Sequence, residues 1–71
     1  MTTTWWFEIE DEESDLCGEE FFVEVEGTMD IAKRIAINKA NELFPDIPYG
    51  KIKCYGRVSE TEAEMMGLDT Y

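Results

Sequence analysis

The residues that could bind a ligand or do chemistry are concentrated in an acidic run from Glu8 to Glu20. The run reads EIEDEESDLCGEE and holds eight carboxylates, with no Lys or Arg to offset them. Carboxylates at this density could coordinate a cation, act as a catalytic acid and base, or present anionic charge to a basic partner. Each of these roles makes a different demand on the neighbouring residues.

A calcium-binding loop is the first role that the sequence tests. Asp11, Glu13 and Asp15 alternate as the first ligands of such a loop do. The glycine required at its sixth position is replaced by Leu16, and the bidentate glutamate at its twelfth position by Phe22. Two cysteines without a histidine also cannot form a closed zinc site unless carboxylates complete it. We therefore expect no metal site and no cofactor, with weak divalent binding as the remaining cation hypothesis.

Catalysis lacks its usual groups. The sequence has no histidine, no glycine-rich phosphate loop and no serine with a base in view. Solvated carboxylates along a surface differ from an acid and base tuned inside a pocket. Cys17 lies among carboxylates, a setting that disfavours a reactive thiolate. The sequence therefore predicts a protein that is not an enzyme.

The net charge of -11 is unevenly distributed. Residues 1–30 contain eleven acids and no base, residues 31–58 contain six bases and two acids, and residues 59–71 contain four acids and no base. Direct binding to nucleic acid or to an anionic membrane is disfavoured, because phosphate would be repelled. A basic protein partner is favoured, and its association should be fast and salt-sensitive.

Length and segment composition indicate one small domain over residues 1–71. The opening MTTTWWFEIE has neither the basic nor the apolar region of a signal peptide, and no stretch approaches the ~20 apolar residues of a membrane span. A cytoplasmic location with Cys17 and Cys54 reduced is the expectation, and a disulfide between them would imply export.

Two alternating segments predict a hairpin over residues 4–26 that carries the acidic loop, about residues 11–19, at its tip. In each segment, every second side chain should face a core, and the side chains between them should face outward. The inward set is Trp5, Phe7, Ile9, Phe21, Val23 and Val25. The outward set is Thr4, Trp6, Glu8, Glu10, Glu20, Phe22, Glu24 and Glu26.

The rest of the chain predicts a helix over 29–44, a strand over 51–58 and a short helix over 60–66. Thr28 is a plausible N-cap of the long helix, and Pro45 ends it. The apolar face of this helix is predicted as Met29, Ala32, Ile35, Ala36, Ala40 and Leu43. In the strand, Ile52, Cys54 and Val58 should share one face, while Lys51, Lys53, Tyr55 and Arg57 share the other.

Three local signals refine these elements. Gly56 suggests a bulge in the last strand. Ser59 and Glu62 form a capping box at the start of the short helix, and Gly67 is suited to its C-cap.

These elements predict an α+β fold, β-β-α-β-α, with the long helix packed on one face of a three-stranded sheet. A right-handed crossover makes the second and third strands parallel. Strand order 2-1-3 is favoured, because the first strand is the most aromatic and suits the centre. That order places Lys51, Lys53 and Arg57 beside Glu8 and Glu10 on the open face, whereas order 1-2-3 places them beside Glu24 and Glu26.

Large aromatic side chains on the open face have two explanations. Trp6 and Phe22 could be covered by the C-terminal helix through Ala63, Met66 and Leu68. They could instead form an aromatic anchor ringed by carboxylates, extended by Tyr55, which is how many recognition patches are built.

Two functions follow from this surface. The first is an inhibitor of the kind carried by phages and mobile elements, which mimics nucleic acid and blocks a basic nucleic-acid-binding partner; here the resemblance is one of size and charge only. Carboxylates on alternate strand residues lie ~6.8 Å apart, a step comparable to that between successive phosphates. The second is an adaptor or accessory subunit, homodimeric if it pairs through a sheet edge, that binds through Trp6, Phe22 and Tyr55.

The predicted acidic contacts are Glu8, Glu10, Asp11, Glu12, Glu13, Asp15, Glu19, Glu20, Glu24 and Glu26. Charge that serves only solubility is the alternative to both.

Overall fold

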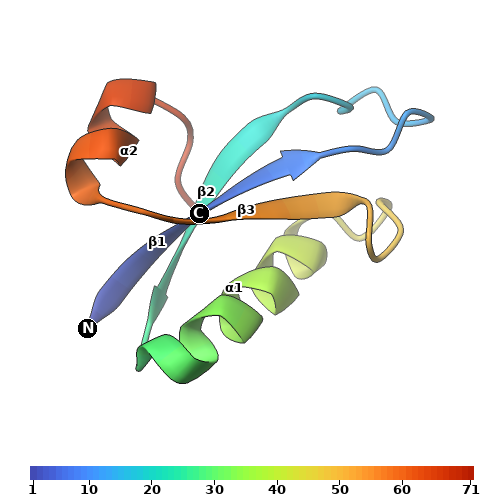
Figure 1. The fold of residues 1–71 in the computed structure, drawn as a ribbon. Coiled ribbons are helices and arrows are strands. Elements are labelled where there is room, and N and C mark those ends of the chain that lie inside the picture. Colours follow the sequence, from blue (N-terminus) through green and yellow to red (C-terminus); the bar gives the residue numbers. More distant parts are fainter.

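A computed structural model describes all residues, 1–71, as a three-stranded sheet with two helices (Figure 1). The elements in chain order are β1 (Thr2–Ile9), β2 (Glu20–Glu26), α1 (Met29–Leu43), β3 (Ile52–Val58) and α2 (Glu60–Met66). The strand order is β2-β1-β3, and β1 is antiparallel to both neighbours, so β2 and β3 run parallel to each other. The predicted α+β fold and its strand order are confirmed.

The core lies between α1 and one face of the sheet. β1 and β2 contribute the predicted inward set, and all six of those side chains are buried. On α1 only Ala32, Ala36 and Ala40 are fully buried, at helical spacings of four residues. Their small side chains allow the helix backbone to approach the sheet closely.

The predicted apolar face of α1 is too wide. Met29, Ile35 and Leu43 are 42%, 39% and 36% exposed, so they flank the contact instead of forming it. The reason is geometric, since a helix that packs through a row of alanines leaves its longer side chains to either side of the contact line.

The helix ends are set by local chemistry. Thr28 is the N-cap residue of α1, as predicted, and has an extended backbone, although its side chain makes no capping hydrogen bond. At α2, Ser59 and Glu62 form the predicted capping box, and Gly67 adopts the left-handed C-cap conformation with φ 65°. α1 ends at Leu43, one residue before the predicted end.

A bulge interrupts the pairing of β1 with β3. Trp6 pairs with Gly56 and Phe7 pairs with Cys54, so Tyr55 is an extra residue on β3. Gly56 has φ 124°, a backbone conformation that side-chain-bearing residues rarely adopt. The predicted bulge is therefore present.

The bulge reverses the alternation of the residues that follow it, and this overturns part of the predicted face assignment. Arg57 pairs with Trp5 and lies on the α1 side, where its Nη1 donates to the sulfur of Met29 at 3.7 Å. Val58 pairs with Thr4 and lies on the open side, where it is 7% exposed. The prediction that Arg57 faces the open side with Lys53 is wrong.

The last residues of the chain form a short parallel extension of the sheet along the outer edge of β2. Thr70 is bridged to Phe22. The amide of Phe22 donates to the carbonyl of Asp69 at 2.8 Å, the amide of Tyr71 donates to Phe22 at 2.9 Å, and the amide of Glu24 donates to Tyr71 at 2.9 Å. This edge is therefore covered over these residues, and α2 lies on the side of the sheet opposite α1 (Figure 1).

Candidate protein-binding surface

The open face of the sheet carries the outward side chains of the hairpin in paired rows. Glu20 lies opposite Glu8, Phe22 opposite Trp6, and Glu24 opposite Thr4. Across the other edge of β1, Lys53 lies opposite Glu8, as the strand order predicted. The face therefore combines aromatic rings with carboxylates at neighbouring positions.

Phe22 is not available to a partner. Its side chain is 0% exposed, and the chain segment after α2 pairs directly with its backbone. Met66 and Leu68 are half-buried, which agrees with the explanation that the C-terminal helix covers aromatic side chains on this face. The prediction that Phe22 is an aromatic contact for a partner is wrong, because the C-terminal segment occupies its side of the sheet.

Trp6 and Tyr55 remain on the open face as a stacked pair. Their ring centroids are 4.4 Å apart with planes inclined by 30°. Trp6 is half-buried, whereas Tyr55 is 43% exposed. The ammonium of Lys53 lies 4.8 Å from the centroid of the Tyr55 ring, within the range of a cation–π contact.

These two aromatic residues also hold the two central carboxylates. The indole Nε1 of Trp6 donates to Oε1 of Glu20 at 2.9 Å, and the Tyr55 hydroxyl donates to Oε1 of Glu8. Both donors are neutral. Glu8 and Glu20 are therefore fixed in position while their negative charge is retained.

The hydrogen bond to Glu8 changes the acidity of Tyr55. It is the main cause that raises the pKa of Tyr55 from 10.0 to about 12, with smaller contributions from burial and from the charges of Glu8, Glu10 and Glu20. A phenol that donates to a carboxylate loses that bond on ionisation, so its neutral form is favoured. Tyr55 consequently stays a donor throughout the neutral pH range.

The acidic loop after β1 is held by its own hydrogen bonds. The amide of Ser14 donates to the Asp11 carbonyl at 3.0 Å, and the amide of Glu13 donates to Oδ1 of Asp11 at 3.2 Å. The amide of Gly18 donates to the carbonyl of Ile9 at 2.8 Å, and this hydrogen bond closes the loop. Only Asp11 uses its carboxylate in these bonds, and most of the other carboxylates are exposed to solvent. The exposed ones are Glu10, Glu12, Glu13, Asp15 and Glu19, and Asp11 is half-buried.

The predicted acidic residues therefore divide into two groups. Glu8, Glu20, Glu24 and Glu26 belong to the open sheet face, and the remaining six belong to the loop. Four of the loop residues line one hollow of about 430 Å³ together with Pro48 and Lys51. Those four are Glu10, Asp11, Glu12 and Glu13.

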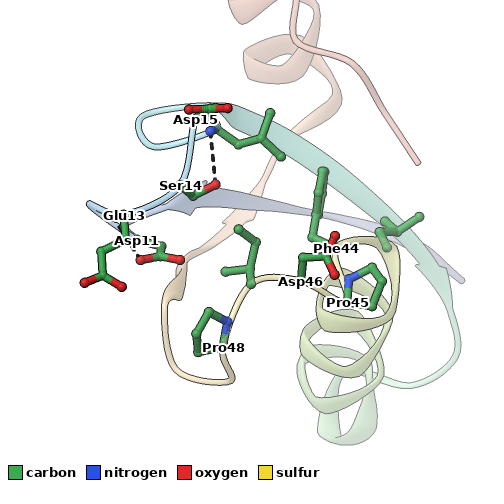
Figure 2. Close-up of a pocket in the computed structure, with 11 residues that line it drawn as sticks. Asp11, Glu13, Ser14, Asp15, Phe44, Pro45, Asp46 and Pro48 are labelled. Carbon is green, nitrogen blue, oxygen red and sulfur yellow. Dashed lines mark hydrogen bonds between the residues drawn. The ribbon is translucent and has the colours of Figure 1, made fainter.

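A larger hollow, of about 600 Å³, separates the acidic loop from the end of α1 (Figure 2). Residues 11 and 13–16 form one side, and residues 43–48 form the other. Sequence reasoning missed this site, because nothing in the local pattern indicates that two segments some thirty residues apart meet.

No protein-family model, curated protein or solved structure matches this chain. The surface itself is therefore the basis for a functional argument.

Other candidate chemistry in the structure is sparse. Cys17 is exposed in the loop and Cys54 is half-buried in β3, both as free thiols. Burial raises the pKa of the Cys54 thiol, opposed in part by a backbone hydrogen bond from Gly56 and the charge of Lys33. No group of three or more Cys, Asp or Glu side chains is arranged to hold a metal ion.

Neither helix has the length and apolar character needed to span a membrane.

Proposed function

We propose that this chain is a non-enzymatic protein that binds a basic protein surface, and that its acidic hairpin occupies a site made for nucleic-acid phosphate. The observation that carries the proposal is the way in which Glu8 and Glu20 are held. Neutral aromatic donors, not Lys or Arg, fix both carboxylates on the open face. Their charge is positioned and remains available to a cationic partner.

Spacing supports nucleic-acid mimicry over unspecific acidity. Glu24 and Glu26 are exposed on the same face of β2, and alternate residues of a strand lie ~6.8 Å apart. Lys and Arg side chains arranged for successive phosphates would meet carboxylates at a comparable step. The exposed acids of the loop extend the anionic surface beyond the strands. An inhibitor of the phage or mobile-element type is the specific form of this proposal.

The aromatic adaptor is the weaker candidate. Its patch loses Phe22, which is fully buried beside the C-terminal segment, and Trp6 is half-buried and stacked on Tyr55. The outer edge of β2 is covered by Asp69–Tyr71, which leaves the outer edge of β3 as the route to a homodimer through strand pairing.

Two charge-matched variants test the proposal. In the first, Glu10, Glu24 and Glu26 are changed to Gln; in the second, Glu42, Glu60 and Glu64 are changed to Gln. All six side chains are exposed, and both variants lose the same charge. Each immobilised variant and the parent chain capture proteins from a lysate of the source cell, with elution by a salt gradient or by duplex DNA.

The parent chain should retain a basic protein that DNA displaces and that elutes at moderate salt, because both depend on charge contacts. The first variant should lose this protein, and the second should keep it. Capture that resists salt and DNA, or equal losses in the two variants, would exclude a hairpin that imitates nucleic acid.

A further inference from the structure

The 600 Å³ hollow between the acidic loop and the end of α1 has two anchored walls. On the α1 side, Phe44 packs on Phe21 with ring centroids 4.9 Å apart, and the amide of Ile47 donates to the Phe44 carbonyl at 3.0 Å. On the loop side, the amide of Leu16 donates to Oγ of Ser14 at 3.1 Å (Figure 2). The hollow is therefore formed before any partner arrives, which lowers the entropic cost of binding.

Two leucines from different segments leave apolar surface open in this hollow. Leu16 of the loop is 40% exposed and Leu43 of α1 is 36% exposed, and both line it with Phe44. Apolar side chains gathered at one concave place provide an anchoring site, whereas scattered ones do not. A volume of about 600 Å³ also falls within the range of ligand-sized sites.

The rim of the hollow is acidic, and no Lys or Arg lines it. Four carboxylates surround its apolar residues, namely Asp11, Glu13, Asp15 and Asp46 (Figure 2). A smaller hollow of about 270 Å³ shares Leu16 and Phe44 with the 600 Å³ hollow. It is rimmed by Glu19, Glu20 and Asp69. An apolar floor thus lies between two groups of negative charge.

We infer that the 600 Å³ hollow receives one apolar side chain from a basic segment of the partner, with Lys or Arg residues on both sides of it in the partner's sequence. Charge complementarity selects this occupant. Its apolar side chain contacts Leu16, Leu43 and Phe44, while the flanking cations meet the carboxylates of the 600 Å³ and 270 Å³ hollows. The inference rests on the proposed function and adds an apolar element to it. Charge attracts the partner, and the hollow discriminates among basic segments.

Two labelled peptides of equal charge separate the apolar contact from the electrostatic one. One has a central Leu flanked on each side by Lys and Arg, and the other has Ser in place of that Leu. Binding to the full chain is measured by fluorescence anisotropy at low salt. The Leu peptide should bind roughly tenfold more tightly, since it buries an apolar side chain that the Ser peptide lacks.

Matched variants of the protein locate the contact. Leu16→Ser should remove the difference between the two peptides, and Ile35→Ser should retain it. Both side chains are apolar and equally accessible, 40% and 39% exposed, but Ile35 does not line the hollow. In amide NMR spectra, the Leu peptide should shift the signals of Leu16 and Ile47, which both line the hollow.

Each result decides between distinct conclusions. Equal affinity for the two peptides overturns the apolar contact but leaves a charge-based partner in place. Absence of binding by both peptides overturns the inferred contact, whereas the proposed function is decided by the capture experiment with the charge-matched variants. A shift of the Trp6 indole without shifts at Leu16 and Ile47 places the peptide on the sheet face and also overturns the inference.

Discussion

The two faces of the β1–β2 hairpin use aromatic side chains in opposite ways. On the α1 side, Phe7 and Phe21 are stacked inside the core, with ring centroids 5.6 Å apart and no polar group of their own. On the open side, Trp6 and Tyr55 are also stacked, but each donates a hydrogen bond to a carboxylate. The same strands therefore build a dry core on one face and a positioned set of charges on the other.

This difference explains how a strongly acidic hairpin can be stable. Glu8 lies directly opposite Glu20, and like charges in a cross-strand pair are destabilising. The hydroxyl of Tyr55 and the indole of Trp6 offset that repulsion without removing the charges. The main apolar cluster lies on the α1 face, and two neutral donors on the other face hold the central carboxylates.

The largest effect should come from removing one buried phenylalanine on each face. Phe7 and Phe22 are both 0% exposed, but Phe7 is covered by α1 and Phe22 lies beside the C-terminal segment. Phe7→Ala should lower the free energy of unfolding by about 3–5 kcal/mol. Phe22→Ala should cost less, about 3 kcal/mol, because a short segment can move to fill part of the cavity.

Urea unfolding followed by circular dichroism measures both changes. If Phe7→Ala does not fold, Phe7→Leu and Phe22→Leu give the same comparison with smaller losses. An equal or larger loss at Phe22 would show that the two faces contribute alike to stability.

The bulge should give the next largest effect. Gly56 has φ 124°, and a Cβ added there would meet no heavy atom within 4 Å, so Gly56→Ala tests backbone strain without steric overlap. We expect a loss of about 1–3 kcal/mol in urea unfolding. The Trp6–Tyr55 stack should weaken as well, which near-ultraviolet circular dichroism would detect. Unchanged stability and an unchanged spectrum would mean that the bulge adapts without cost.

The backbone pairing of Asp69–Tyr71 with β2 should contribute less to stability. The ring of Tyr71 meets Phe21 and Phe44 edge-on, with centroids 5.9 and 6.3 Å away. Tyr71→Ala should cost about 1 kcal/mol and speed hydrogen exchange at the amides of Phe22 and Glu24, whose acceptors lie in this segment. Tyr49→Ala is the control, since Tyr49 is 78% exposed. Equal exchange rates in the two variants would contradict a role for Tyr71 in holding Asp69–Tyr71 against β2.

The sequence was informative where structure is locally encoded. Strict alternation in the hairpin placed Trp5, Phe7 and Ile9 on the core face, and the capping box of Ser59 and Glu62 marked the start of α2. The strand order followed from the aromatic content of β1 and from crossover geometry. These features depend on neighbouring residues or on general rules of chain connection.

The errors have physical causes that a local pattern does not contain. Gly56 signalled the bulge, but the extra residue reverses the direction of every later side chain, so Arg57 and Val58 exchanged faces. Phe22 is covered by residues nearly fifty positions away, and the sequence DTY carries no strand signal of its own. The hollow between the loop and α1 likewise depends on tertiary packing alone.

The smallest effect, and the most specific to the open face, is the ionisation of Tyr55. Its pKa of about 12 lies above the ordinary 10.0, so folding favours the neutral phenol. The stability that this group contributes is fully present below pH 10 and is lost as the pH rises through 12. The tyrosinate absorbance of the parent chain, minus that of Tyr55→Phe, isolates this titration.

Replacing the acceptor tests the cause of the shift. Glu8→Gln should lower the pKa of Tyr55 toward 10, because a neutral amide accepts the phenol proton less strongly and adds no negative charge. Glu42→Gln removes the same charge from α1 and should leave the titration in place. If both variants titrate like the parent chain, Tyr55 does not hold Glu8. The display of charge on the open face would then rest on Trp6 and Glu20 alone.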